Sequence, residues 1–277
     1  IELTDAFKIH AGLRYSSFQH SGYISFRDYL KNEIEANNDN YRHLEPRLSF
    51  RYKLNSTSSL KGAYTQNYQY VHLALLSGSS LPSDLWVPSS SEIKPKFSTQ
   101  YGIGYFKNLK DNMYETSIEA YYKEMTNLIE YKEGVLPEDN TNSNSDGAFT
   151  FGNGDSYGLE LLIKKTKGNT TGWIGYTLSK TTRYFDEVND GIAFPAKYDR
   201  RHDLSITAKH KLSEKWTLSS VFVYATGNAI TLPTERYMVG GNIYTEYTSR
   251  NGFRMEPYHR LDIGATYTPK KKKRFQS

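Results

Sequence analysis

Apolar and polar residues alternate along many short stretches of the chain. The first stretch places apolar side chains at every second position, namely Phe7, Ile9, Ala11, Leu13 and Tyr15. Successive side chains of a strand point to opposite faces, so each such stretch predicts a strand with one apolar and one polar face. The pattern occurs ten times and predicts strands at 6–17, 44–54, 59–70, 97–107, 113–124, 156–165, 172–181, 202–211, 216–225 and 258–268.

The connections between these predicted strands alternate between short and long. The short ones are rich in turn-forming residues and cover 55–58, 108–112, 166–171 and 212–215. The long ones run roughly over 18–43, 71–96, 125–155, 182–201 and 226–257. Short periplasmic turns and long outer loops are typical of transmembrane β-barrels. We therefore predict an all-β, antiparallel transmembrane β-barrel segment of about ten strands, with residue 1 on the periplasmic side.

Composition agrees with a barrel that contacts outer-membrane lipid. Mean hydropathy is only −0.69, which a barrel tolerates because half of every strand faces a polar interior. The chain has 24 Tyr, 13 Phe and 3 Trp, and aromatic residues form girdles at both membrane interfaces. A soluble carbohydrate-binding β-sandwich is the alternative that this aromatic content leaves open. Lysines gather in the predicted short turns, so the run 270–274 predicts a solvated turn near lipid headgroups rather than a nucleic-acid site.

The chain is expected to be one domain, 1–277, that forms part of a larger barrel. Strands in lipid must close into a barrel, because an open edge leaves backbone groups unpaired. Complete barrels usually finish on a strand with a terminal aromatic residue, whereas this sequence ends in the basic turn 270–277. The sequence has no cysteine, which excludes a disulfide framework and a thiolate metal site.

Several short motifs resemble the barrel of TonB-dependent outer-membrane receptors. They include Arg47-Leu48-Ser49-Phe50-Arg51-Tyr52, Tyr157-Gly158-Leu159-Glu160, Gly175-Tyr176-Thr177-Leu178-Ser179-Lys180, Tyr198-Asp199-Arg200-Arg201-His202-Asp203-Leu204 and Ala225-Thr226-Gly227-Asn228-Ala229. Each motif is weak alone, but their order and spacing cover essentially the whole chain. The resemblance implies a barrel of about 22 strands with a plug domain in its lumen. It also implies energy-coupled import through the TonB complex, in the outer membrane of a Gram-negative cell, of a scarce ligand such as a siderophore, vitamin, glycan or peptide.

Two sets of residues are candidates for binding that ligand. Arg200 and Arg201 lie where a long loop re-enters a strand, and their guanidinium groups suit an anionic ligand. The prevailing interpretation of 198–203 is a salt-bridged network that holds the loop to the barrel mouth. Aromatic rings near the long loops are candidates for stacking on a ligand, although a girdle or loop packing explains them equally well: Tyr68, Tyr70, Trp86, Tyr184 and Phe185. Charged residues predicted to face the lumen are mixed in sign and suit hydrogen bonds to a plug: Arg14, Arg47, Arg51, Glu115, Glu119 and Glu160.

Two other classes of barrel remain open. One is a self-contained ten-stranded barrel enzyme, such as an outer-membrane protease, in which His202 with Asp199 or Asp203 would be a general acid–base pair. That pair needs a nucleophile or an activated water, and the sequence indicates neither. The other is a passive porin or an adhesin. We expect a receptor rather than an enzyme, with no catalytic residue, cofactor, metal site or nucleic-acid partner.

Overall fold

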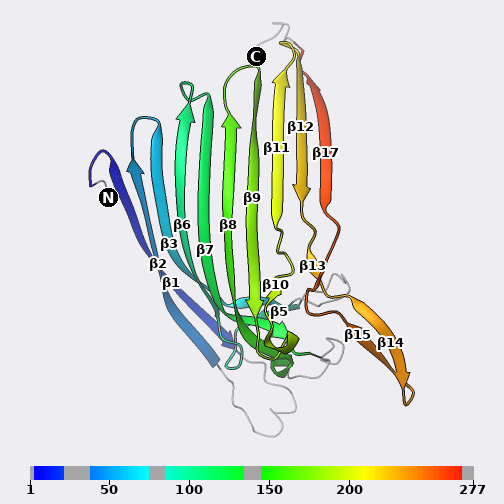
Figure 1. Cartoon of the computed structure of the whole chain (residues 1–277). Coiled ribbons are helices and arrows are strands. Elements are labelled where there is room, and N and C mark those ends of the chain that lie inside the picture. The colour runs from blue at the N-terminus through cyan, green and yellow to red at the C-terminus, as the bar shows by residue number, and fades with distance from the viewer. Residues whose placement is uncertain (1–2, 22–37, 75–84, 134–144, 270–277) are drawn as a thin grey trace, which may run out of the picture.

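A computed structural model describes residues 3–21, 38–74, 85–133 and 145–269. Ten long strands lie side by side in chain order in one antiparallel sheet, which is the predicted fold class (Figure 1). They are β1 (Phe7–Ser21), β2 (Asn38–Lys53), β3 (Ser58–Gln69), β6 (Lys96–Leu109), β7 (Tyr114–Tyr131), β8 (Phe149–Lys165), β9 (Thr170–Tyr184), β11 (His202–Lys211), β12 (Trp216–Ala225) and β17 (Tyr258–Tyr267). A short strand, β10 (Phe194–Pro195), pairs with β9. Among the described residues the sheet does not close, because β1 and β17 are its two edges.

All ten predicted strands are present, but several extend further into the long connections than the sequence predicts. β1 continues to Ser21, β2 begins at Asn38, and β7 and β8 pair as far as Tyr131 and Phe149. In β7 the register shifts between Met125 and Leu128. This bulge breaks the period-two pattern without ending the backbone pairing, which explains why the sequence places 125–155 in a loop.

The long connections contain short paired strands that are not predicted from the sequence. β4 (Val71–Ala74) pairs with β5 (Leu85–Pro88), β14 (Pro233–Val239) with β15 (Asn242–Tyr247), and β13 (Ala229–Ile230) with β16 (Phe253–Arg254). The β14–β15 hairpin projects away from the sheet at the end where the long connections gather (Figure 1). Within 3–21, 38–74, 85–133 and 145–269, the helical segments are two single turns of 3₁₀ helix, η2 (Ser145–Ala148) and η3 (Asn189–Gly191). No helix within the described residues is long and apolar enough to cross a membrane.

The register places most apolar residues of the ten strands on one face, and Phe106, Leu162, Trp173, Val221 and Val223 are exceptions on the other face. Tyr101 of β6 lies opposite Tyr122 of β7, which lies opposite Tyr157 of β8. The same face continues to the edge strands, where Leu13 is 67% exposed and Ile263 is 76% exposed. A continuous exposed apolar face is typical of a surface that meets lipid. We call it the outward face, and the opposite polar face, which carries the hollows of the sheet, the inner face.

Two small cores pack the long connections against the loop ends of the strands. The first joins the β4–β5 hairpin to the ends of β7 and β8 and contains Ala74, Val87, Ile93, Ile129, Tyr131, Ala148 and Phe149. The second contains Leu128, Phe185, Val188 and Phe194. Phe185 is 1% exposed, so it belongs to loop packing and offers no surface to a ligand. These cores fix the outer loops in place over the strand ends.

The β4–β5 hairpin contains a buried histidine, His72. We predict that this residue makes the opening of the hairpin depend on pH. His72 is fully buried, and its Nε2 is 3.0 Å from the Ser89 hydroxyl. Burial, and to a lesser extent the nearby charge of Lys96, lower the pKa of His72 from 6.5 to about 4. An opened hairpin therefore binds a proton between pH about 6.5 and 4, where the closed one does not. The free energy that favours the closed hairpin has its full value above that range, and it decreases by up to ~3 kcal/mol as the pH falls through the range.

Amide hydrogen exchange at 71–74 and 85–88, corrected for the intrinsic pH dependence of exchange, would measure this effect. We expect the hairpin to be open a larger fraction of the time at pH 5 than at pH 7, so the corrected exchange rate should be higher at pH 5. His72→Gln cannot titrate in this range, so its opening should not change with pH. The same pH dependence in this variant would show that another group is responsible.

Candidate functional site

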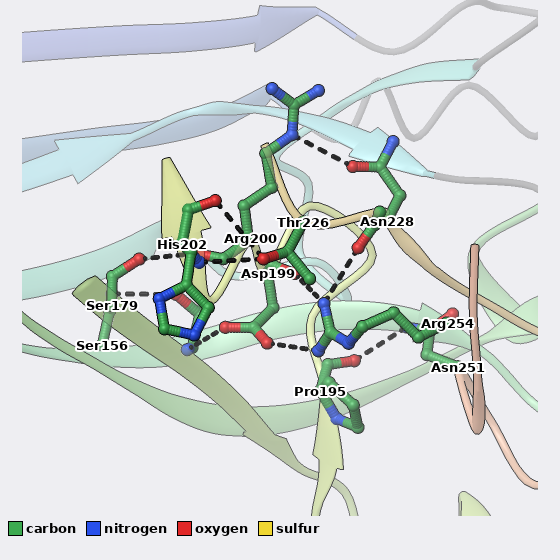
Figure 2. Close-up of polar contacts among 12 residues, drawn as sticks. Ser156, Ser179, Pro195, Asp199, Arg200, His202, Thr226, Asn228, Asn251 and Arg254 are labelled. Carbon is green, nitrogen blue, oxygen red and sulfur yellow. Dashed lines mark hydrogen bonds and ion pairs between the residues drawn. The ribbon is translucent and has the colours of Figure 1, made fainter. Parts of the chain in front are cut away.

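The segment 198–203 is held at the mouth of the sheet by one buried carboxylate. Asp199 is 2% exposed. One of its carboxylate oxygens accepts a hydrogen bond from the Thr181 backbone N–H at 2.7 Å, and the other lies 2.7 Å from Arg254 Nη2. Arg254 Nη1 donates to the carbonyl oxygens of Asp199 and Gly227 (Figure 2). The segment is therefore tied both to β9 and to the long connection 226–257. The sequence predicts a salt-bridged network that holds this loop to the mouth, and its buried partner, Arg254, lies outside 198–203.

A second ion-pair group fastens the same long connection to β7 and β9. Glu130 is buried, and its two carboxylate oxygens lie 3.2 Å from Arg183 Nη1 and 3.9 Å from Arg250 Nη1. Arg250 also donates to the Tyr131 carbonyl oxygen at 3.2 Å. Neither Arg250 nor Arg254 is a candidate from the sequence, because their partners are distant along the chain.

The two predicted arginines occupy different surroundings. Arg200 is exposed, and its Nε lies 3.3 Å from Asn228 Oδ1 (Figure 2). Its Nη1 lies 3.9 Å from Asp203 Oδ2. The guanidinium group therefore remains accessible at the mouth. Arg201 is half-buried, and its carbonyl oxygen accepts a hydrogen bond from the Ser179 N–H at 3.1 Å. Ligand contact by either residue stays a prediction.

The acid–base pair considered from the sequence is not assembled. His202 lies opposite Leu178 and Asp203 opposite Thr177, so the two neighbours point to opposite faces of β11. His202 Nδ1 is 2.7 Å from the Tyr176 hydroxyl instead. Asp199 is engaged by Arg254. Among the described residues, no cluster of three or more His, Asp or Glu side chains could hold a metal ion.

Two predicted aromatic residues, Tyr68 and Tyr70, meet at the loop end of β1–β3. The Tyr68 ring stacks on His43 with centroids 3.7 Å apart. The Tyr70 ring stacks on Phe18 at 5.2 Å, and its hydroxyl lies 2.6 Å from Ser16 Oγ and 3.0 Å from His43 Nδ1. His43 is not a candidate from the sequence, because the segment 18–43 is predicted to be a loop. The alternation of Tyr41, His43 and Glu45 on β2 is the signal that identifies this face.

A buried carboxylate lies beside this aromatic group. Glu45 is fully buried and follows His43 on the inner face of β2. Its Oε2 is 3.8 Å from Arg14 Nη1 and 3.7 Å from Arg47 Nη2. Both arginines are about half exposed. The outer part of β1–β3 therefore presents stacked rings beside two guanidinium groups whose charge a single glutamate only partly offsets. We call this the mouth cluster: Arg14, Phe18, His43, Glu45, Arg47, Tyr68 and Tyr70.

The other two predicted aromatic residues lie apart from the mouth cluster. Trp86 is 62% exposed on β5, opposite Leu73. Tyr184 ends β9 and shares the outward face with Ile174 and Leu178. The outward position of Tyr184 favours a girdle role over ligand contact. Binding by Trp86 and Tyr184 stays a prediction.

One row of the inner face separates basic from acidic residues, whereas Glu45 on β2 and Lys164 on β8 keep the face as a whole mixed in sign, as the sequence predicts. This row of directly opposed residues runs across six strands and consists of Lys8, Arg51, Lys61, Gly104, Glu119 and Glu160, from β1 to β8. In this row, basic residues therefore stand together on β1–β3 and acidic residues on β7–β8. Gly104 separates the two groups and opens a hollow between them.

An apolar outward face, a polar inner face and long packed loops at one end define an outer-membrane β-barrel segment. The chain belongs to the TonB-dependent receptor family, because the family model described as "TonB dependent receptor-like, beta-barrel" matches residues 1–276. Its fold class and its resemblance to these receptors are thereby confirmed. Comparison with curated protein sequences gives no match.

Solved structures of outer-membrane receptors share this fold. The ferripyoverdine receptor of Pseudomonas aeruginosa, bound to ferripyoverdine, superposes with a TM-score of 0.63 at 18% identity, covering 98% of this chain and 31% of that chain. The FrpB iron transporter of Neisseria meningitidis gives 0.60 at 14% identity, with 96% and 36% covered. The ferric-catecholate import receptor Fiu of E. coli K12 gives 0.59 at 14% identity, with 98% and 37% covered. The chain thus spans about a third of the length of each structure.

Proposed function

We propose that this chain is the barrel portion of an outer-membrane TonB-dependent receptor that binds a scarce extracellular ligand and imports it by energy coupling. The match of the receptor-barrel family over residues 1–276 supports this function most strongly. A ten-stranded barrel enzyme finds no support at the mouth, because His202 and Asp203 point to opposite faces. A passive porin would leave the row of like charges on the inner face uncovered.

The row of like charges on the inner face supports a plug domain as the occupant of the lumen. Arg51 and Lys61 lie directly opposite each other, as do Glu119 and Glu160. Like charges directly opposite on neighbouring strands destabilise a sheet. A plug surface with acidic groups facing β1–β3 and basic groups facing β7–β8 would offset both repulsions. The plug is in turn the part of such a receptor that the TonB complex engages.

The mouth cluster favours an anionic ligand with planar aromatic groups. Tyr68 and Tyr70 form a half-buried aromatic stack with Phe18, His43 and Phe97, and Arg14 and Arg47 place partly exposed guanidinium groups beside it. Arg200 adds a third guanidinium group at the mouth. A ferric siderophore with catecholate groups combines both properties. Vitamins, glycans and peptides are the other ligand classes of such receptors, and few of them combine negative charge with planar rings.

Uptake by cells that carry the intact receptor tests the proposed function. We expect a radiolabelled ferric catecholate to bind with or without a working TonB complex, and to enter cells only when TonB and the proton gradient are intact. Entry that continues without TonB would indicate a passive pore. An absence of binding for catecholates together with TonB-dependent entry of another solute would keep the transport function and reject this ligand class.

Removing the ring of Tyr70 should weaken ligand binding at the mouth. Tyr70→Ala removes a stacking face and the hydroxyl that joins Ser16 to His43. An aromatic contact of this kind contributes about 1 kcal/mol, so the Kd of the receptor–ligand complex should rise roughly fivefold to tenfold. Tyr157→Ala is the matched control, because it removes an equal ring from the outward face at a residue that is not a binding candidate. Equal losses in both variants would contradict a specific role for the mouth cluster.

A further inference from the structure

Three lysines and one tyrosine lie near one another on the outward face, at the short-turn end of β6–β8. Lys107 lies on β6 opposite Thr116, and Lys165 lies on β8 directly opposite Tyr114. Lys110 belongs to the turn between β6 and β7. Its Nζ is 5.7 Å from the centre of the Tyr114 ring, and the Nζ of Lys165 is 6.0 Å from the same centre. The ammonium groups of Lys110 and Lys165 thus both lie near the Tyr114 ring, and Lys107 lies on the same face opposite Thr116.

The charge of this lysine group is not balanced by the acidic residues nearest to it in the chain. Glu115 follows Tyr114 but points to the inner face, where its Oε2 is 3.0 Å from Lys164 Nζ. Asp111 lies in the turn beside Lys110 and its single carboxylate can offset at most one of the three lysine charges, while its backbone carbonyl oxygen accepts a hydrogen bond from Lys167 Nζ. The π face of one tyrosine attracts a cation only weakly at an exposed site. The group therefore keeps an excess of positive charge on a surface that faces away from the lumen.

The lysines stand where the apolar outward face ends. Above Tyr114 on the same face follow Ile118 and, on the neighbouring strand, Leu161 and Ile163. The next outward tyrosine of β7 is Tyr122, about 27 Å from Tyr114 along the strand. With a strand tilt near 40°, this corresponds to about 20 Å across the membrane, close to the ~25 Å apolar band of such barrels. Tyr114 and Tyr122 thus fit the two interfacial girdles, with the lysines at the periplasmic one.

We propose that Lys107, Lys110 and Lys165 bind the phosphate of a phospholipid headgroup in the periplasmic leaflet of the outer membrane. The acyl chains would lie along Ile118, Leu161 and Ile163, and the Tyr114 ring at the level of the glycerol backbone. An anionic lipid such as phosphatidylglycerol fits best, because its headgroup carries no cation that would repel the three ammonium groups. This site goes beyond ligand transport and involves neither the lumen nor the mouth.

Native mass spectrometry of the intact receptor, purified in detergent and titrated with phosphatidylglycerol, tests the proposal. The variant K107Q/K110Q/K165Q removes the three outward charges. The matched control, K53Q/K209Q/K211Q, removes three lysines from the same end of the sheet whose side chains belong to the inner face. Each lysine near a membrane surface contributes several-fold to the attraction of anionic lipid. We expect the outward variant to lose roughly tenfold or more in affinity, and the control to change less than about twofold.

Three results would overturn the proposal: an unchanged affinity in the outward variant, equal losses in both variants, or equal binding of diacylglycerol, which lacks the phosphate. Displacement of the lipid by an equal concentration of inorganic phosphate would also overturn it, because the site would then recognise free phosphate. Heat-modifiable migration on gels verifies that each variant is folded. The measurement requires neither transport ligand nor TonB, so its outcome is independent of the proposed function.

Discussion

Replacing Arg254 by alanine is expected to release the long connection 226–257 from the mouth of the sheet. The substitution leaves Asp199 buried without its cationic partner and removes the donors to the carbonyl oxygens of Asp199 and Gly227. Breaking a buried ion pair by removing one partner costs about 3–5 kcal/mol. Because about a third of the Arg254 side chain remains exposed (32%), we expect a loss of about 2–3 kcal/mol in the free energy of local opening. Amide hydrogen exchange at 194–203 and 226–257 would measure it.

Two further variants make this prediction specific. Arg236→Ala removes an exposed arginine from the β14–β15 hairpin and should leave exchange at 194–203 unchanged. The double variant Asp199→Asn with Arg254→Met removes both charges, so part of the lost stability should return. If Arg254→Ala exchanged no faster than the wild type, the connection would be held mainly by Glu130 and Arg250.

A methyl group at position 172 is expected to separate β9 from β11. Gly172 has a φ of +156°, and a Cβ atom there would lie 2.0 Å from the Thr207 carbonyl oxygen and 3.0 Å from the Ala208 Cα. Both atoms belong to the backbone of the neighbouring strand and cannot rotate away. Gly172→Ala should therefore lower the free energy of unfolding by about 3 kcal/mol, through strain and lost pairing hydrogen bonds. Urea titration of the intact receptor, followed by heat-modifiable migration on gels, would show a lower midpoint.

Gly12→Ala is the matched control for this substitution. Gly12 also lies in a long strand, but a Cβ atom there meets nothing within 4 Å. The variant should be neutral or slightly more stable, because alanine loses less backbone entropy than glycine on folding. A Gly172→Ala receptor as stable as the Gly12→Ala receptor would mean that β9 and β11 can move apart at little cost.

Most of the sheet follows from the sequence because a strand repeats every two residues, and the family resemblance follows from short motifs in a fixed order. Phe7 to Tyr15 and Leu261 to Tyr267 alternate clearly, and the register places both sets on the outward face. Where alternation fails, so does the prediction. The bulge at Met125 hides the outer part of β7, and short hairpins such as β4–β5 carry too few residues for a pattern to form.

The candidate sites depend more heavily on contacts between distant parts of the chain. The sequence points to the segment 198–203 and to Tyr68 and Tyr70, because charged and aromatic residues gather there. It does not identify Arg254 as the partner of Asp199, or His43 as the ring beneath Tyr68. These pairs join segments that only the folded loops and the strand register bring together.

The inner face shows the same division. The alternation with apolar neighbours on each strand is enough to place Arg51, Glu119 and Glu160 on the polar face. The pairing of the folded strands is needed to show that Arg51 lies beside Lys61, that Glu119 lies beside Glu160, and that Gly104 lies between the two groups. The period of a strand fixes the face of each side chain, whereas its neighbours across the sheet depend on a register that is set by turns and pairing.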